Sequence, residues 1–329
     1  MIKERPMEET FYDRWLRVED KVREAFTNSP VIARDAETPW VATRQDAKVK
    51  LMIARERGFP TMGSIVLKAE IPSGWHTGAH AHGEESMHIL SGEGFSLIEG
   101  RRYPWRAGST LQIPYRARHQ HFNTGPEPVL YVSGMCLDLE EFVHLGAVHQ
   151  FEYCGPNEPG FDQSGEAAED EYLGDRRVVI HLDEVGTDGS GDPTFSLEAN
   201  QNQHYRNLFL VVPGNGFKAE SVAITHIFEE PPGYHGGRHK HLEAVLYVLE
   251  GEGFTEIEGI KHRWQAGDVM HVPPAMFEHE HYNDTGKAYR LLRIQFGIRF
   301  WFTDIWPEGY TSRRVYDEQG NPLVAGTLR

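Results

Sequence analysis

One stretch of this chain occurs twice. Shifting the sequence by 159 residues aligns residues 72–100 with 231–259, and 15 of the 29 aligned positions are identical. Both copies read Gly-aromatic-His-x-Gly-x-His-x-His-x-Glu, followed by an apolar run and then Gly-Glu-Gly-Phe. Self-similarity of this kind indicates a duplicated folding unit. The chain has 329 residues, which is enough for two such units with separate cores.

Each copy is predicted to be mostly β. Short apolar segments rich in β-branched and aromatic residues are bounded by Gly, Pro, Asn and Asp, as expected for antiparallel strands joined by tight turns. Many short strands with regular turn signals are typical of a small barrel or jelly roll. The strands are expected at residues 64–71, 86–90, 130–134, 222–228, 245–249 and 289–296.

Helix is predicted clearly at one place, residues 8–26 near the N-terminus. Thr10 is a suitable cap, and apolar residues follow at close to helical spacing. We expect this short N-terminal helix to pack outside the first barrel or against a neighbouring subunit. The apolar positions are Phe11, Trp15, Val18, Val22 and Phe26.

A polar linker separates the two copies. Residues 155–177 are rich in Gly, Pro, Asp, Glu, Asn and Ser, with too few apolar residues to fold alone. The domain boundary is therefore predicted near residue 170. Residues 1–170 would hold the N-terminal helix, the first barrel and the acidic linker, and residues 171–329 would hold the second barrel.

Composition limits the partners and the compartment. The net charge of −16 and the absence of a Lys/Arg-rich stripe predict that the chain does not bind nucleic acid. No apolar run is long enough to cross a bilayer, and the charged start of the sequence lacks a signal peptide, so a cytoplasmic protein is expected. The two cysteines, Cys136 and Cys154, are interpreted as ordinary thiols.

The histidines cluster in both copies. Residues two apart in a strand point to the same face, so each His-x-His pair should share a face. If a second pair lies on a neighbouring strand, both pairs point into the barrel and converge. Three neutral imidazoles can then hold a first-row divalent metal and leave positions open for substrate. The pairs are His80 with His82, His119 with His121, His239 with His241, and His279 with His281.

The spacing of these residues resembles the two motifs of the cupin superfamily. The first motif appears as Gly74, His80-Ala-His82, Glu84-Glu85 and Gly92, and again as Gly233, His239-Lys-His241, Glu243 and Gly251. The second appears as Gly108, Pro114, His119 and Asn123, and again as Gly267, Pro273, His279 and Asn283. The resemblance covers about residues 60–145 and 215–305 and implies an all-β bicupin, two tandem cupin jelly-roll β-barrels.

The resemblance also bears on the ligands. The family's fourth ligand, a Glu, has no clear counterpart, because Glu85 falls at that position in the first copy and Ala244 in the second. The acid present in both copies is Glu84 and Glu243, two residues past each histidine pair and expected on the same face. A site of three histidines is therefore preferred. It consists of His80, His82 and His119 in one barrel and His239, His241 and His279 in the other.

The His-x-His-aromatic-Asn form of the second motif looks like the gentisate dioxygenase-like branch of bicupins, which cleave aromatic rings with Fe(II) and O₂. That resemblance implies an Fe(II)-dependent dioxygenase acting on a small hydroxylated aromatic acid. His121 and His281 would exchange a proton with the substrate hydroxyl. Arg116 and Arg118 could clamp a carboxylate.

Two other functions remain open. The first is a Mn(II)-dependent decarboxylase, lyase or isomerase of a small organic acid, similar to oxalate decarboxylase. The second is a bicupin that binds a small molecule without catalysis. The expected partners are a small-molecule substrate and O₂, with neither nucleic acid nor membrane. Because barrel edges invite pairing between subunits, a homo-oligomer is also expected.

Overall fold

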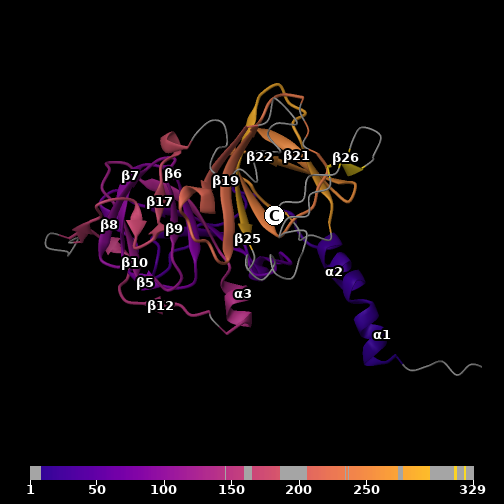
Figure 1. Cartoon of the computed structure of the whole chain (residues 1–329), viewed down its shortest axis with the longest axis horizontal. Helices are drawn as coiled ribbons and strands as arrows, with labels where there is room; N and C mark the ends of the chain where they lie inside the picture. The colour runs from indigo at the N-terminus through magenta and orange to yellow at the C-terminus, as the bar shows by residue number, and fades with distance from the viewer. Residues whose placement is uncertain are drawn as a thin grey trace, which may run out of the picture.

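A computed structural model of the chain describes residues 9–144, 146–158, 165–185, 206–233, 235, 237–272 and 277–296, together with the short strands at 315–316 and 322–323. Two β-barrels lie side by side in it, the first drawn in purple and magenta and the second in orange (Figure 1). The predicted all-β architecture with two jelly-roll barrels is confirmed.

The first barrel has two sheets. One is a six-stranded sheet in the order β17-β9-β6-β11-β3-β2. The other has the order β12-β5-β10-β7-β8-β14, with β4 on β10 and β13 on β4. The first sheet contains β17 (Val179–Ile180), β9 (Thr110–Ile113), β6 (Glu85–Ser91), β11 (Val129–Met135), β3 (Ile65–Ile71) and β2 (Lys48–Ile53). The second contains β12 (His149–Gln150), β5 (His80–Ala81), β10 (His119–Asn123), β7 (Glu93–Ile98), β8 (Arg101–Arg106), β14 (Glu166–Ala167), β4 (Trp75–His76) and β13 (Gly155–Pro156).

The second barrel repeats this plan. Its larger sheet has the order β1-β23-β20-β25-β19-β18, and its smaller sheet the order β22-β21-β24. The strands predicted from apolar runs are confirmed in both barrels, with ends within two residues. The larger sheet contains β1 (Ile32–Ala33), β23 (Val269–Val272), β20 (Ala244–Glu250), β25 (Tyr289–Phe296), β19 (Val222–Glu230) and β18 (Arg206–Val211). The smaller contains β22 (Ile260–Gln265), β21 (Glu252–Ile257) and β24 (His279–Tyr282). Two further pairs are β15 (Tyr172–Leu173) with β16 (Arg176–Arg177), and β26 (Val315–Tyr316) with β27 (Pro322–Leu323).

The six-stranded sheet of each barrel includes one short strand from the segment that precedes the other barrel in sequence. Ile32 of β1, which precedes the first barrel in sequence, pairs with Met270 in the second. Val179 of β17, which precedes the second barrel, pairs with Leu111 in the first. Since Leu111 and Met270 are equivalent in the repeat, the two exchanges mirror each other. Each of these two strands thus pairs with the barrel on the other side of the predicted domain boundary at residue 170. For the rest of the two barrels, that boundary stays a prediction.

The described residues form three apolar cores, one inside each barrel and one between the two barrels. One core fills each barrel, with Met87 and Ile89 of β6 in the first and Leu246 and Val248 of β20 in the second. The third lies between the barrels, where it contains Val132 together with residues of β20 and β25. Because strand side chains alternate between faces, one strand supplies both its own barrel and the interface. The larger sheets therefore face each other across a shared apolar layer.

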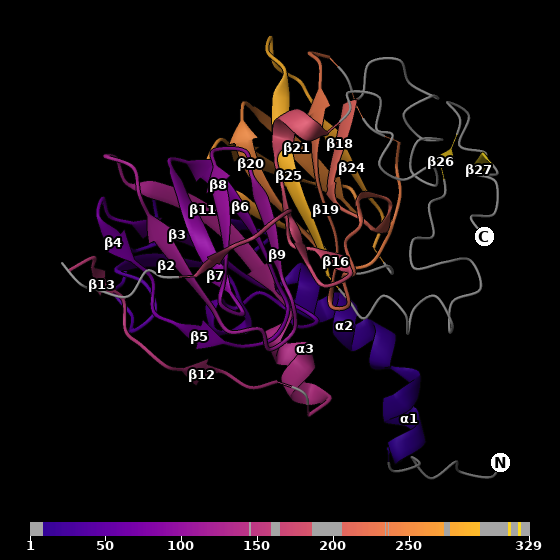
Figure 2. The ribbon, with the colours of Figure 1, turned by 60° about the vertical axis from the view of Figure 1, so that its left-hand side comes forward.

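The N-terminal helix is two helices, α1 (Phe11–Leu16) and α2 (Val18–Thr27), separated at Arg17. The predicted cap is confirmed, because Oγ1 of Thr10 accepts a hydrogen bond from the N–H of Asp13. Of the two predicted packing partners, the first barrel is wrong, because the described contacts of α2 are with the second barrel, and a neighbouring subunit stays a prediction. The Phe26 ring of α2 stacks on that of His271 in the second barrel, with the ring centroids 5.6 Å apart. Both figures show α1 projecting away from the barrels (Figures 1 and 2).

Short segments complete the fold. α3 (Leu137–Phe142) follows the first barrel, and the polar linker then runs along that barrel through β13 and β14. Both cysteines are free thiols, as predicted. None of the helices in the described residues has the length and apolar character that a membrane-spanning helix needs.

Candidate metal centre

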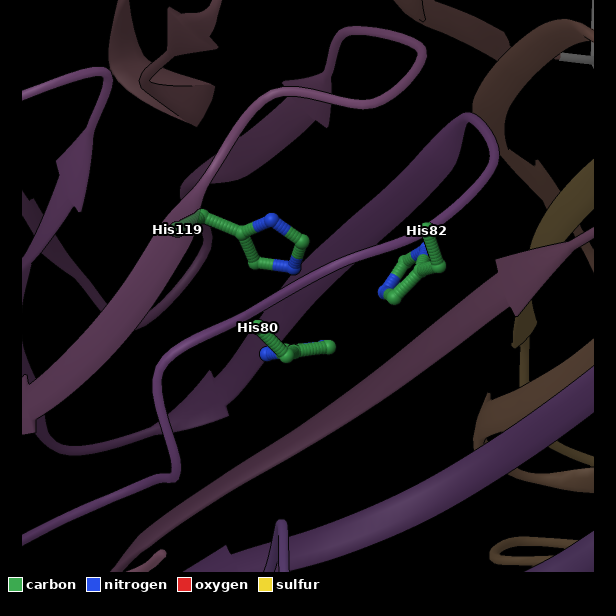
Figure 3. Close-up of side chains that lie close together, drawn as sticks. All are labelled: His80, His82 and His119. Carbon is green, nitrogen blue, oxygen red and sulfur yellow. The ribbon is translucent and has the colours of Figure 1, made fainter. Parts of the chain in front are cut away.

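Three imidazoles converge inside the first barrel. His80 on β5 pairs directly with His119 on β10, and His82 follows β5 by one residue. The ring centroids are 4.1 Å apart for His80 and His119, 4.7 Å for His80 and His82, and 4.8 Å for His82 and His119. Figure 3 shows the three rings turned toward a common point. The predicted convergence of the two pairs is confirmed for this barrel.

Backbone carbonyls orient these rings. Nδ1 of His80, His82 and His119 lies 3.3, 2.8 and 2.8 Å from the carbonyl oxygens of Gly78, Gly83 and Ala117. A carbonyl oxygen only accepts, so Nδ1 carries the ring proton and Nε2 keeps a free lone pair. Nε2 of His82 and of His119 is buried and has no hydrogen-bond partner in the described part of the chain. Buried polar atoms without hydrogen-bond partners are rare, and the lone pairs of these two nitrogens can serve as metal donors.

A carboxylate completes this cluster. Oε2 of Glu85 lies 3.4 Å from Nε2 of His82 and 3.6 Å from Nε2 of His119. Burial alone would raise the pKa of Glu85, but the neighbouring His119 and His82 hold that pKa well below its usual value. The site in the first barrel therefore has three histidines and an ionised carboxylate, rather than the three histidines that the sequence favoured.

Glu84 does not share the histidine face, and that prediction is wrong. The chain bends at Gly83 between β5 and β6, so the alternation of strand side chains is interrupted between His82 and Glu84. In β6, Glu85 lies opposite Ile113 and Met135 and points into the barrel with them. Glu84 points away from the histidines.

The repeated acids, Glu84 and Glu243, form hydrogen bonds across the interface between the barrels. The buried carboxylate of Glu84 accepts hydrogen bonds from the N–H groups of Glu220, Ser221 and Val222 in the second barrel, at 2.6 to 3.0 Å. Glu243 mirrors it and accepts from the N–H of Met62 in the first barrel at 3.0 Å. Met62 and Ser221 are equivalent in the repeat, so each barrel reaches into the other with the same acid.

The cluster in the first barrel fits a transition metal. Donor atoms that sit about 2.1 Å from a common ion are roughly 3.0–3.4 Å apart, close to the separations between Glu85 and the two imidazoles. Neutral imidazole and carboxylate donors suit Mn, Fe, Co, Ni, Cu or Zn. His80, His82, His119 and Glu85 can therefore hold a first-row divalent ion.

A fourth imidazole is held at the edge of this cluster. Nδ1 of His121 lies 2.7 Å from Oγ of Ser96, which accepts a hydrogen bond from Nε1 of Trp105 at 2.9 Å. A ring nitrogen of His121 comes within 4.8 Å of donor atoms on Glu85 and His119. Burial and the adjacent His119 lower the pKa of His121 to about 3, so this ring is neutral at physiological pH.

Asp46 and Tyr131 extend the polar wall of the first barrel. Oη of Tyr131 donates to Oδ1 of Asp46 at 2.7 Å, and both side chains are buried. The Tyr131 ring lies 6.1 Å from that of His121. Burial, together with the charge of Glu85, raises the pKa of Asp46 to about 7.

Arg116 and Arg118 lie outside the cluster. Both are exposed, with the Arg116 guanidinium over the Tyr115 ring and that of Arg118 over the Phe151 ring. Arg118 also forms an ion pair with Glu152 at 3.3 Å. Because His119 faces inward, the preceding Arg118 must face outward. The structure thus does not bring these arginines to the histidines as predicted.

The second barrel repeats the imidazoles. The rings of His239 and His279 are 4.4 Å apart, and those of His241 and His279 4.7 Å. Nδ1 of His281 lies 2.8 Å from Oγ1 of Thr255, which accepts from Nε1 of Trp264 at 3.0 Å. The predicted convergence is therefore confirmed here as well, including the support for the fourth ring.

The charges beside the second cluster differ from those in the first barrel. Ala244 stands where the first barrel has Glu85, and Glu243 is bound to Nε2 of His271 at 2.6 Å. Arg293 of β25 lies close enough to add to the effect of burial in lowering the pKa of His239, to about 4, and that of His281. The second cluster has a guanidinium nearby instead of a carboxylate.

The sequence does not predict three residues beside the first cluster, Asp46, Tyr131 and Ser96. It does place Glu85 at the position of the fourth ligand, but it favours a site of three histidines. A signal existed for Ser96, because Thr255 occupies the equivalent position and both hydroxyl residues directly follow a Gly-Phe pair. Asp46 has no such signal, since it lies outside the repeated segment.

The comparisons with known proteins agree with this fold. A family model described as a cupin domain matches residues 67–135 and again 226–294. A search of curated proteins finds no match.

Among solved structures, a variant of salicylate 1,2-dioxygenase from Pseudoaminobacter salicylatoxidans in complex with gentisate is similar, with a TM-score of 0.59 and 14% identity. The alignment covers 92% of this chain and 84% of that one. A Bacillus subtilis oxalate decarboxylase with Mn(II) centres is similar with a TM-score of 0.63 and 14% identity, over 82% of this chain and 78% of that one. At these identities the likeness concerns the fold. The chain therefore contains two cupin domains, one in each barrel, which is a bicupin arrangement.

Proposed function

We propose that this bicupin is an Fe(II)-dependent dioxygenase that cleaves a small hydroxylated aromatic acid with O₂, and that the first barrel is the reactive one. The observation that carries the proposal is the convergence of the buried Nε2 atoms of His82 and His119 on the ionised carboxylate of Glu85. An ion bound there would supply a Lewis acid and an electron path between substrate and oxygen.

The lining of the first barrel supports an aromatic substrate. Met87, Ile89 and Ile113 are fully buried and lie on the inward face that also carries Glu85. Apolar side chains with a few convergent polar groups are typical of sites for small organic ligands. Arg116 and Arg118 face outward and do not reach the substrate. In this proposal the substrate carboxylate therefore binds to the metal ion.

His121 is proposed to form a hydrogen bond with the substrate hydroxyl and to exchange a proton with it. Trp105 donates to Oγ of Ser96, and in our proposal the Ser96 hydroxyl donates in turn to Nδ1 of His121, which leaves the ring proton on Nε2. The neutral ring then presents Nε2–H toward the cluster, where it can hydrogen-bond to a substrate oxygen. His281 has the same support in the second barrel, from Thr255 and Trp264.

One observation favours a second candidate, a Mn(II)-dependent decarboxylase, lyase or isomerase of a small organic acid. The position of Glu85 supplies the carboxylate that the sequence left in doubt, and the decarboxylase similar in fold has Mn(II) centres. A small dicarboxylate carries two charges and needs cationic anchors. Arg116 and Arg118, the candidates for that role, face solvent, which is why we rank this function second.

Oxygen uptake tests the proposal. Protein loaded anaerobically with Fe(II) is mixed with a panel of hydroxybenzoates and air-saturated buffer, and oxygen consumption and ultraviolet spectra are followed. We expect consumption that depends on one class of hydroxylated acid. His119→Ala should abolish the reaction, whereas His279→Ala, its matched control in the second barrel, should retain most of it.

The alternative is tested with the same preparation. Mn(II)-loaded protein that releases CO₂ from a small dicarboxylate without consuming oxygen would replace the dioxygenase proposal by the second candidate. Loss of oxygen uptake in His279→Ala but not in His119→Ala would place the reaction in the other barrel.

A further inference from the structure

The buried pair of Asp46 and Tyr131 lies beside the fourth imidazole of the first barrel. Tyr131 is 4% exposed and Asp46 is 4% exposed, yet neither belongs to the repeated histidine motifs. The hydrogen bond from Oη of Tyr131 occupies Oδ1 of Asp46. A buried carboxyl with one neutral donor is costly, because an ionised acid normally needs several donors to replace water.

The loop that carries Asp46 is fixed next to the histidine strands. Oγ1 of Thr43 accepts a hydrogen bond from the N–H of Asp46 at 2.9 Å, which closes a tight turn. Gly78, two residues before His80, donates its N–H to the carbonyl of Gln45 at 2.8 Å. His80 itself is oriented by the carbonyl of Gly78. A backbone hydrogen bond therefore joins the turn that holds Asp46 to the segment that leads into the strand of His80.

Tyr131 is placed by its strand. In β11 it lies opposite Ile89 and Ala69 and so faces the interior of the barrel. The equivalent position in the second barrel is Leu291, which lies opposite Val248 and Phe228 in the same register. The polar pair is thus specific to the barrel that also carries Glu85, and a leucine fills the position in the barrel that lacks this carboxylate.

We propose that Asp46, held by Tyr131, accepts a hydrogen bond from a ring hydroxyl of the substrate, and that this contact determines which hydroxylated aromatic acid the first barrel prefers. The inference rests on the proposed function, since it assigns the substrate-selecting residues of that same site. The hydroxyl that Asp46 binds is one that does not bind the metal ion. Tyr131 occupies Oδ1, and the substrate hydroxyl meets Oδ2.

The pair should act as a strict filter for that hydroxyl. A site that buries a polar group to match a substrate hydroxyl rejects the analogue without it, because the buried group is then left unpaired. A hydrogen bond to a charged group changes affinity by about tenfold or more. The preference should therefore appear in binding, before any chemistry.

A binding comparison separates this contact from metal binding. Salicylate and the four dihydroxybenzoates that contain its 2-hydroxyl share the groups that can chelate an ion, and differ only in a second hydroxyl. Each is titrated into Co(II)-loaded protein under anaerobic conditions, and the visible bands of Co(II) report binding without turnover. We expect the wild type to bind one dihydroxybenzoate at least tenfold more tightly than salicylate.

The variants then assign the contact. Asp46→Asn should remove that preference to within about threefold and leave the affinity for salicylate unchanged. Tyr131→Phe should lower the preference at the same ring position and at no other. An unchanged preference in Asp46→Asn overturns the inference while leaving the proposed function intact. If the wild type binds none of these acids, the proposed function fails, and this inference with it.

A matched variant controls for general effects of losing a buried tyrosine hydroxyl. Tyr289 donates to Glu230 in the second barrel, and both side chains are buried, as in the pair of the first barrel. Tyr289→Phe should leave every ring preference within twofold of the wild type. A shift in preference in this variant equal to that in Tyr131→Phe would contradict the assignment. Cobalt content and melting temperature of all variants confirm that the site is formed.

Discussion

The two barrels place equivalent histidines in equivalent positions, but they surround them with opposite charges. In the first barrel, Glu85 lies within 3.6 Å of two imidazole nitrogens and stays ionised. In the second, Ala244 removes that carboxylate and Arg293 lies near the imidazoles. The three histidines alone would give the two sites equal affinity for a metal cation. The neighbouring charges favour cation binding in the first barrel and oppose it in the second.

This difference teaches how a duplicated fold can specialise. Strand pairing and apolar packing keep the imidazoles in place in both copies, because each His-x-His pair is fixed by its register. Residues next to the cluster are free to change, and a single exchange of Glu for Ala changes the local charge by one unit. Since like charges repel, a guanidinium near the second cluster opposes binding of a divalent ion.

The largest expected effect is on metal affinity when a ligand of the first barrel is lost. His119→Ala removes one donor of four and should weaken the tight site by more than about 1,000-fold, or roughly 4 kcal/mol. The measurement is competition for Co(II) against a chromophoric chelator. His279→Ala, the equivalent change in the second barrel, should leave the tight site unchanged. Two sites of equal affinity in the wild type would break the comparison.

A second effect concerns the reciprocal acids at the interface, where the barrels are also unequal. Glu84 accepts hydrogen bonds from three backbone N–H groups, whereas Glu243 accepts one from Met62 and is bound to His271. Glu84→Gln should lower the free energy of unfolding by about 3 kcal/mol, because buried N–H groups lose their acceptor. Glu243→Gln should cost about 1 kcal/mol. Urea titrations of the metal-free proteins measure both, and equal losses would contradict the asymmetry.

The exchange of Glu85 and Ala244 tests the comparison directly. Glu85→Gln keeps the size of the side chain but removes its charge, and should weaken the tight site by about 10–100-fold. Ala244→Glu places a carboxylate beside the second cluster and should strengthen that site by a smaller factor, since Arg293 remains. The same chelator competition measures both changes. Failure of Ala244→Glu to strengthen the second site would assign the difference to Arg293 alone.

The sequence predicts the barrels well for a physical reason. Their strands are apolar runs bounded by turn residues, and the repeat shows each signal twice, so β3, β6 and β11 and their counterparts are expected almost to their ends. The convergence of His80, His82 and His119 follows from the same regularity. It needs only that side chains alternate along a strand and that two strands are neighbours.

The features that the sequence does not predict arise where the chain departs from the regular alternation of side chains along strands. A bend at Gly83 puts Glu85 beside the histidines and Glu84 at the interface, which no period of two predicts. The exchanged strands β1 and β17 are two residues long and carry no periodic signal. Asp46 bonds to Tyr131 near the site, and its turn is joined to Gly78 by a backbone hydrogen bond. These are tertiary contacts between segments distant in sequence.

The last expected effect is a pH dependence that comes from the second barrel and amounts to about 1 kcal/mol for each pH unit. Burial raises the pKa of Glu230 to about 8, against an ordinary value of 4.5, while Ile71 occupies the equivalent position in the first barrel. A carboxyl whose pKa is raised by folding binds a proton more tightly in the native state. Its contribution to stability is therefore present at low pH and is lost as the pH rises from about 4.5 to about 8.

Within that window the loss approaches about 1.4 kcal/mol per pH unit, because the unfolded carboxyl is ionised while the native one is protonated. Glu230→Gln keeps a neutral group in the same place. The difference in unfolding free energy between wild type and variant should therefore shift by about 1 kcal/mol in favour of the variant for each unit between pH 5 and pH 7. Urea titrations of metal-free protein at several pH values measure it, and a difference independent of pH would show that Glu230 is ionised inside the barrel.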